Sequence, residues 1–472
     1  MVQTNTAILT LVGTLAIILV FGVYYGRAKL EDVEDFLSGR GTMGFSLGLG
    51  TFIAYAAGSG LLFSPPEVGA TIGLPAVIGY GFAIAAPFLV YMSVAPKIRE
   101  RMPNGHSIPE YARVRYGKPM YILTMVVTLF YMFILMTANL TGIAIALNAI
   151  AGVPLLITLI LVMGTVMIYT VQGGLLSAIF TDVLQAIVLI PLLVVTAIVA
   201  VFELGGPRSM FSKIQTQSPA LVDLTNAAGV RFAVYIIIAL IGAEMLNQSL
   251  WQRAHAATDS RSLRISFAGA ALAVIPLGVL AGLYGVIAGG LGMDFPSPSA
   301  ALPTVVEVTL GPGMQLVFIV LIILVITSTL DNALSAIVSI LAVDIMPFVA
   351  DQKGDKLLRT SRVLTFAIAI VGVGIALAEP SVLFLLLRAD LLASATVGPI
   401  LLGLYTPRLS GTAAFVAALL AMMAGIPWFL AENYLLSFTT AIIVSIGIAV
   451  AWMTIRPAEF SFSALNELEE LE

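Results

Sequence analysis

Apolar runs of bilayer length are the feature of this sequence that most constrains its fold. Runs of about 18 or more largely apolar residues recur from one end of the chain to the other, and each can cross a hydrocarbon core of about 30 Å. With 60% hydrophobic and 10% charged residues among 472, the chain has more apolar surface than a water-soluble fold can bury. The sequence therefore predicts an all-α polytopic membrane protein whose outer surface contacts the lipid bilayer.

The apolar runs, counted between polar or Gly/Pro breaks, predict about 13 transmembrane helices. They are centred in residues 6–26, 45–72, 73–96, 119–150, 153–171, 181–203, 231–252, 264–290, 314–342, 361–378, 382–405, 411–431 and 435–455. The first run has no basic residue before it and no small-residue cleavage pattern after it. We therefore expect a retained helix and not a signal peptide.

The distribution of Lys and Arg predicts the orientation, because short cytoplasmic loops collect positive charge. With the N-terminus outside, the cytoplasmic segments hold 18 of the 22 basic residues, Arg253 among them. The outer side keeps Arg208 and Lys213, with Arg231 at a helix mouth, while Arg388 lies within a span. We therefore expect a multi-pass protein of the cell membrane, with the N-terminus outside and the acidic tail, residues 466–472, in the cytoplasm.

Two predicted spans contain helix-breaking residues at membrane depth. The second is interrupted at residues 57–60 and again at Pro65 and Pro66, and the seventh at residues 242–244. Freed backbone groups are tolerated in a membrane where they line a polar cavity. Breaks five spans apart fit inverted repeats, in which an odd number of spans reverses the second copy, as in many secondary transporters. The alternative is that the glycines serve only close helix packing.

Charged residues inside the predicted spans cost about 2.5 to 3.5 kcal/mol each at a helix centre, so each needs a partner or a wet cavity. They are Asp182, Glu244, Asp331, Arg388 and Asp390. Ser328, Asp331 and Asn332 share one helical face by their i, i+3, i+4 spacing. Such a face offers the oxygen ligands that hard cations prefer. Alternatively, the hydroxyls bond to preceding carbonyls and Asp331 pairs with a neighbouring helix.

Several other polar residues have simpler interpretations. Arg388 and Asp390 are two residues apart, so they point to different faces of a helix, and Arg388 is interpreted as an ion-pair or gating residue. Glu67 follows a Pro-Pro pair near the outer mouth, where a solvated gate residue is expected. His106 and His255 lie in basic loop segments and are interpreted as surface or packing residues.

The sequence offers little for other classes of function. It contains no GxSxG elbow, HExxH, Walker A loop or GxGxxG after a strand, so neither an enzyme nor an ATP-driven pump is expected. The net charge of -4 gives no indication of a nucleic-acid partner. The chain has no cysteine, which excludes disulfides and thiolate metal sites.

Several stretches together resemble the sodium:solute symporter family, which includes proline, sugar, sialic acid, pantothenate and urea carriers. Residues 173–185 resemble the family signature, with its Gly-Gly-Leu and Thr-Asp-x-x-Gln elements. Residues 247–253, followed by Ala256 and Ala257, resemble the end of its seventh helix. Ser328-Thr329 and residues 343–345 fit its ninth. The matches keep their order over roughly residues 40–410.

The resemblance implies a leucine-transporter-like core of five plus five inverted helices, formed by spans two to eleven. Residues 1–44 would form an N-terminal extra helix and a cytoplasmic loop. Residues 45–407 would form the transport core, with repeats at 45–203 and 229–407. Residues 408–472 would form two C-terminal helices and the acidic cytoplasmic tail.

The resemblance also implies ion sites. The main sodium site would use the carbonyls of Ala54, Ala57 and Val325 and the hydroxyls of Ser328 and Thr329.

Relatives similar to the sialic acid carriers hold a second sodium beside the signature aspartate. Here that site would comprise Asp182, Ser328, Asp331 and Asn332. The family usually has serines at the last two positions. Two close carboxylates repel each other unless a cation or a proton lies between them, so a second cation or a proton is expected there.

The substrate is expected between the two helix breaks, near Ser59, Gly60, Glu244 and Asn247, because unwound backbone supplies polar groups at the midplane. Glu244 favours a substrate with an amide or an amine, and the break lacks the polar side chains of sugar carriers. A small polar solute, such as urea or an amino acid, is therefore the expected cargo, with Na+ as the co-transported ion.

These interpretations combine into sodium-coupled symport by alternating access. The first alternative is a proton-coupled carrier of the same architecture, in which Asp182 or Asp331 takes the proton. A second, from another class, is a membrane sensor built on a transporter body.

Overall fold

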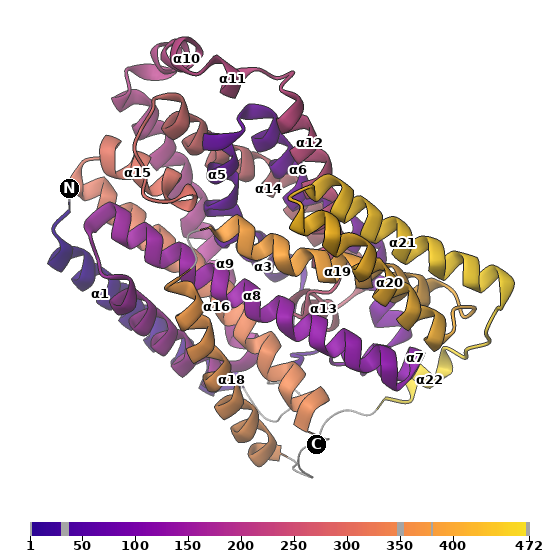
Figure 1. The fold of residues 1–472 in the computed structure, drawn as a ribbon. Helices are drawn as coiled ribbons and strands as arrows, with labels where there is room; N and C mark the ends of the chain where they lie inside the picture. The colour runs from indigo at the N-terminus through magenta and orange to yellow at the C-terminus, as the bar shows by residue number, and fades with distance from the viewer. Residues whose placement is uncertain (1, 30–36, 347–353, 379–380, 469–472) are drawn as a thin grey trace.

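The computed structural model describes residues 2–29, 37–346, 354–378 and 381–468. Regular structure within these ranges is helical, apart from an isolated parallel bridge between Met43 and Ala257 (Figure 1). The first half holds α1 (Thr4–Lys29), α3 (Phe45–Ala56), α4 (Ser59–Leu62), α5 (Ser64–Thr71), α6 (Leu74–Arg101), α7 (Ile108–Tyr116), α8 (Lys118–Ala151), α9 (Leu155–Glu203), α10 (Gly206–Gln217) and α11 (Pro219–Val222). The second half holds α12 (Ala227–Glu244), α13 (Gln248–Ala256), α14 (Ser260–Gly290), η1 (Pro298–Ala300), α15 (Ala301–Thr309), α16 (Pro312–Ile340), η2 (Leu341–Ile345), α18 (Gly354–Ala376), α19 (Val382–Tyr405), α20 (Gly411–Leu430), α21 (Tyr434–Ile455) and α22 (Ser463–Asn466).

The apolar helices make this chain a multi-pass membrane protein. Its described part holds 11 helices that are long and apolar enough to cross a bilayer, or 12 when one bent pair counts as a span. The predicted count of about 13 is therefore not confirmed. The difference lies in α9, a continuous helix of 49 residues that covers two predicted spans, 153–171 and 181–203. A glycine costs a helix only about 1 kcal/mol, less than a backbone break in lipid, so Gly173 and Gly174 do not end it.

The predicted break in the second span is confirmed. Helices Phe45–Ala56 and Ser59–Thr71 meet at an angle of 55° across Ala57 and Gly58. The short helices α4 and α5 follow the break, and Pro65 and Pro66 lie in the first turn of α5, where proline is tolerated. The break is therefore a bend between helical segments, in the middle of a buried stretch.

The break in the seventh span lies later than predicted. α12 continues through residues 242–244 and ends at Glu244, and α13 begins at Gln248. A Cβ atom added at Gly242 would lie 2.2 Å from Ser394 Oγ, so this glycine permits close contact between α12 and α19. The chain turns instead at Asn247, whose side chain accepts a hydrogen bond from Ser249 N and caps α13.

The long helices pack around α16, which is more buried than every other candidate span of the described residues except α19. α16 contacts α1, α8 and α9, while α3 lies against α9 and α14 (Figure 1). About two thirds of the apolar window of α16 is buried, 67%, against 33% for α1 and 28% for α21. α10 and α11 lie at one end of the long helices, and α7 and α22 lie at the other (Figure 1). Polar side chains on α16 are thus held away from lipid.

Candidate ion and substrate sites

The break after α3 lies directly against α16. A Cβ atom added at Gly58 would lie 2.6 Å from Thr329 Cγ2, so only glycine allows this approach without displacement. Asn139 of α8 joins the two elements, because its Oδ1 accepts hydrogen bonds from Thr329 Oγ1 at 2.6 Å and from Ser59 N at 3.1 Å. Asn139 was not among the predicted site residues, although an amide side chain within an apolar helix is a visible signal.

The predicted sodium ligands lie on the two segments that make this contact, α3 with its break and α16. The Ala54 carbonyl accepts a hydrogen bond from Ala57 N at 3.1 Å, and the Val325 carbonyl accepts one from Thr329 Oγ1 at 3.3 Å. No backbone amide in the described residues donates to the Ala57 carbonyl, which lies at the negative end of α3. The contact therefore presents carbonyl and hydroxyl oxygens, the donors that hard cations prefer.

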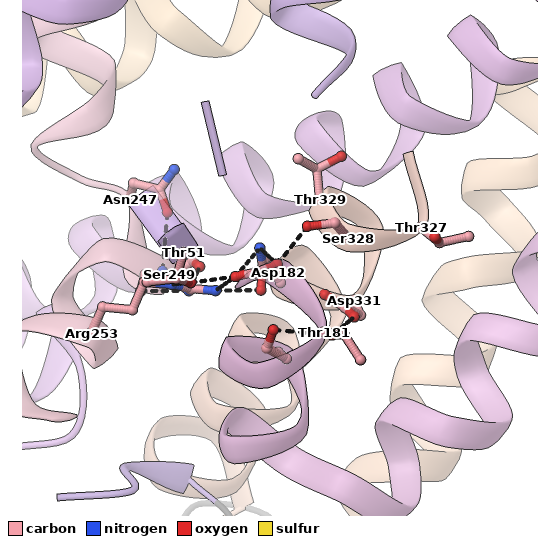
Figure 2. Close-up of polar contacts among 12 residues, drawn as sticks. Thr51, Thr181, Asp182, Asn247, Ser249, Arg253, Thr327, Ser328, Thr329 and Asp331 are labelled. Carbon is pink, nitrogen blue, oxygen red and sulfur yellow. Dashed lines mark hydrogen bonds and ion pairs between the residues drawn. The ribbon is translucent and has the colours of Figure 1, made fainter. Parts of the chain in front are cut away.

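Ser328, the other predicted hydroxyl ligand, lies beside Asp182. Its Oγ donates a hydrogen bond of 2.5 Å to Asp182 Oδ1, which leaves its oxygen lone pairs as potential ligands. Ser328 therefore links the predicted sodium site to the carboxylate cluster, and Figure 2 shows its contact with Asp182.

Asp182 of α9 is paired with the guanidinium of Arg253 on α13. Arg253 Nη2 lies 2.8 Å from Asp182 Oδ2, and both side chains are fully buried. Thr51 Oγ1 also donates to this oxygen, and Asn332 Nδ2 lies 3.3 Å from Oδ1. Arg253 Nε donates to Thr51 Oγ1 at 3.0 Å, Nη1 donates to Ser249 O at 3.1 Å, and Nη2 also donates to Asn332 Oδ1 (Figure 2). The ion pair is thus fully hydrogen-bonded.

Arg253, which the sequence assigns to the cytoplasmic side, is buried within the fold. It lies on α13, which continues the seventh span after the break and is buried along its length. Its charge is tolerated there because Asp182 compensates it. A positive charge of the protein itself thus already lies beside Asp182, at the position predicted for a second cation.

Asp331 belongs to an adjacent cluster with different partners. Its Oδ2 accepts hydrogen bonds from Tyr169 Oη at 2.8 Å and from Thr181 Oγ1 at 3.4 Å (Figure 2). Its Oδ1 has no hydrogen-bond partner among the described residues. The structure thus brings Asp182, Ser328 and Asn332 into direct contact and gives Asp331 neutral partners. A cation or proton shared by the two carboxylates stays a prediction.

A cavity of about 70 Å³ lies beside the break. Three of the four predicted substrate residues line it, namely Ser59, Gly60 and Glu244. Asn247 is not among the lining residues. Its Nδ2 instead donates a hydrogen bond of 2.9 Å to Glu244 Oε2 and so orients that carboxylate.

Tyrosines complete the surroundings of Glu244. Tyr55 Oη donates to Oε2 at 2.6 Å, Tyr131 Oη donates to Oε1 at 3.1 Å, and Tyr91 Oη donates to the backbone carbonyl at 2.8 Å. Tyr55 and Tyr131 line the cavity. These tyrosines were not predicted, because in the sequence a tyrosine of a binding site looks the same as a tyrosine that only packs within an apolar span.

Asp390 of α19 is a second carboxylate of the cavity and was not predicted there. Its residue is 3% exposed, and it lines the cavity. Arg388, two residues earlier, is exposed, and its guanidinium lies 4.2 Å from the centroid of the Phe384 ring. The prediction that these two residues point to different faces is confirmed.

The prediction that Glu67 is solvated is wrong. The residue is 8% exposed, and its carboxylate accepts hydrogen bonds from Ser299 Oγ at 2.8 Å and Ser381 Oγ at 2.7 Å. Helix α5 is covered by η1 and the start of α19, so Glu67 joins these elements. His106 and His255 are buried, which fits the packing interpretation.

Comparisons with known proteins show what this chain resembles. The model of the sodium:solute symporter family matches residues 36–425. A spermidine transporter of Candida albicans is 26% identical over 407 residues, covering 85% of this chain and 75% of the relative. An osmoregulated proline transporter of Bacillus subtilis is 26% identical, covering 95% of each.

A solved structure shares the fold. A Na+-coupled sialic acid symporter, in a substrate-bound outward-open state, superposes with a TM-score of 0.78 at 17% identity, covering 96% of this chain and 99% of that one. The predicted all-α, leucine-transporter-like fold is therefore confirmed.

Proposed function

This chain belongs to the sodium:solute symporter family and is a secondary transporter of solutes, and on that premise we propose that it couples uptake of a small polar solute to sodium. The observation that carries the proposal is the contact of the α3 break with α16 at Gly58 and Thr329. It gathers carbonyl and hydroxyl oxygens beside a cavity, where a cation would bind.

The proposed sodium site comprises the carbonyls of Ala54, Ala57 and Val325 and the hydroxyls of Ser328 and Thr329. A sodium ion there would hold the break against α16, and the break lines the solute cavity through Ser59 and Gly60. Binding of either ligand would then favour binding of the other, which is the reciprocal coupling that symport needs.

The proposed solute site is the cavity that Glu244 lines and Asn247 supports. The named solutes of the two relatives, spermidine and proline, both contain amine nitrogen. A carboxylate held by three donors favours a solute that brings an amide or an amine to it. A small polar, nitrogen-containing solute is therefore the proposed cargo.

The proposed mechanism is alternating access by a core of residues 45–407, in which repeats 45–203 and 229–407 move relative to each other. The N-terminus is proposed to lie outside the cell, so that an inward-negative potential adds about 2.3 kcal/mol per charge per 100 mV to sodium entry.

The test is uptake by proteoliposomes under a sodium gradient, screened over urea, amino acids, amines and small carboxylates. In the Ser328→Ala, Thr329→Ala double variant, the sodium concentration for half-maximal uptake should rise at least tenfold. The matched control is Ser361→Ala, Thr365→Ala on α18, whose buried hydroxyls bond only to carbonyls of their own helix. Unchanged sodium dependence in the first variant would remove the proposed site.

A proton-coupled carrier is the second candidate, and Asp331 is the observation that favours it. This carboxylate is buried, has only neutral partners and leaves Oδ1 unbonded among the described residues. Uptake that follows an inward proton gradient without sodium, and is lost in Asp331→Asn, would select this candidate. Uptake that needs sodium at every pH would exclude it.

A further inference from the structure

The solute cavity carries two carboxylates and no basic side chain. Glu244 and Asp390 line it, and no Lys, Arg or His lies among its lining residues. The guanidinium of Arg253 is engaged with Asp182 outside the lining. The cavity therefore carries two acidic groups and no basic side chain that could balance their charge.

The two carboxylates differ in how they are held. Glu244 accepts hydrogen bonds from Tyr55, Tyr131 and Asn247. These donors are neutral, so they orient the carboxylate without neutralising it. Asp390 has no hydrogen-bond donor among the described residues, although it is 3% exposed. A buried carboxylate without a partner is costly, so a positive ligand in the cavity would remove that cost.

The walls of the cavity are aromatic. Tyr55, Tyr80, Phe88 and Tyr131 are among its lining residues. Aromatic faces attract ammonium groups, by about 0.5 to 2 kcal/mol according to how far they are desolvated. Aromatic rings also pack against methylene groups between the charges of an alkylamine. The ammonium groups and the methylene groups of an alkylamine can therefore both contact these aromatic rings favourably.

Other solute classes fit this cavity less well. The backbone amide of Ser59, at the break, already donates to Asn139, so it is not free to bind a solute carboxylate. An amino acid would bring its carboxylate toward two like charges. A neutral solute such as urea would leave both charges unbalanced.

We propose that the cargo is an organic cation, a short aliphatic diamine or polyamine, with one ammonium group at Glu244 and a second at Asp390. The inference rests on the proposed function in taking this cavity as the transport site. It adds the charge of the solute and its two points of attachment.

The experiment is equilibrium binding of radiolabelled 1,4-diaminobutane to the purified full chain at a fixed sodium concentration. Competitors are 1-aminobutane, urea and L-proline. Unlabelled 1,4-diaminobutane should displace the label at least tenfold better than 1-aminobutane does. Urea and proline should compete least. In Asp390→Asn, the affinity for the diamine should fall at least tenfold, toward that of the monoamine. Asp294→Asn, which neutralises an exposed aspartate outside the cavity, should bind as wild type does.

Each outcome separates the inference from the proposed function. If proline or urea displaces the label better than 1-aminobutane, or the diamine does not bind while sodium drives uptake of another solute, the inference is overturned and symport stands. If the diamine binds as expected but its uptake ignores the sodium gradient, sodium coupling fails and the inference stands. Should Asp390→Asn not fold, the wild-type competition series decides alone.

Discussion

Asp182 and Arg253 show how single residues are tolerated in the interior of this protein. Each is fully buried, and each would be costly alone. Together with Thr51, Ser249 and Asn332 they form a cluster in which each guanidinium nitrogen has an acceptor. A sodium ion beside Asp182 would have to share it with this guanidinium.

The first prediction concerns this ion pair. Arg253→Gln should destabilise the protein by about 3–5 kcal/mol, because it leaves the buried carboxylate of Asp182 uncompensated. The double variant Arg253→Gln, Asp182→Asn should recover much of that loss. Thermal unfolding in detergent measures both. A double variant no more stable than Arg253→Gln would show that the pair is not the source of the effect.

The second prediction concerns a cation or proton shared by Asp182 and Asp331. Sodium binding measured across pH 5 to 8 should lose affinity as the pH falls if Asp182 and Asp331 share an ion or a proton. Asp331→Asn should weaken that pH dependence. Curves that overlay for wild type and variant would leave Arg253 as the cation of Asp182 and Asp331 as a structural partner of Tyr169.

Asn139 is the third residue with a specific expectation. Asn139→Ala removes the acceptor shared by Ser59 N and Thr329 Oγ1, so the break should lose its fixed position against α16. We expect at least a tenfold weaker sodium affinity, measured from the sodium dependence of uptake. Asn148→Ala, on the same helix, removes only a bond to the Val153 carbonyl and is the matched control.

At the scale of elements, glycine has different uses in the two broken spans. Gly58 lies at the break itself and admits Thr329, whereas Gly242 lies inside α12 and admits Ser394. The sequence pattern is the same in both cases. Only the packing partners distinguish a break from a close helix contact.

Gly58→Ala tests the element contact. Its new Cβ atom would lie 2.6 Å from Thr329 Cγ2, so α16 and the break must move apart. Sodium-dependent uptake should be lost while the protein still inserts. Gly164→Ala on α9, where a Cβ atom meets no atom within 4 Å, should keep wild-type uptake. Normal sodium affinity in Gly58→Ala would show that this contact does not form the sodium site.

At the scale of the whole molecule, orientation remains a prediction that a simple experiment can check. The chain has no cysteine, so each introduced cysteine gives a signal without background. Ser212→Cys in α10 and Arg261→Cys in α14 both replace described, polar positions at opposite predicted sides, and Ser212 and Arg261 are exposed. A membrane-impermeant maleimide should label the first in intact cells and the second only after permeabilisation. The reverse labelling pattern would show that the protein has the opposite orientation in the membrane.

The sequence by itself determined that the chain is an all-helical membrane protein of this family, with a break in the second span. These follow from local properties, because apolar length decides membrane crossing and glycine and proline decide where a helix yields. It also selected Ser59, Gly60 and Glu244 for the cavity, because a charge or a freed backbone group at membrane depth is costly unless it lines a polar cavity.

Only the tertiary structure decided which polar groups meet. Arg253 was assigned no partner and Glu67 was assigned to solvent, because the sequence does not show which residue a charged side chain will contact. Asp182 and Arg253 are 71 residues apart, and Glu67 and Ser381 are 314 apart. Asp390 and the tyrosines around Glu244 came into view in the same way. A partner distant in the chain can convert a costly buried charge into a stable pair, and folding alone brings that partner into contact.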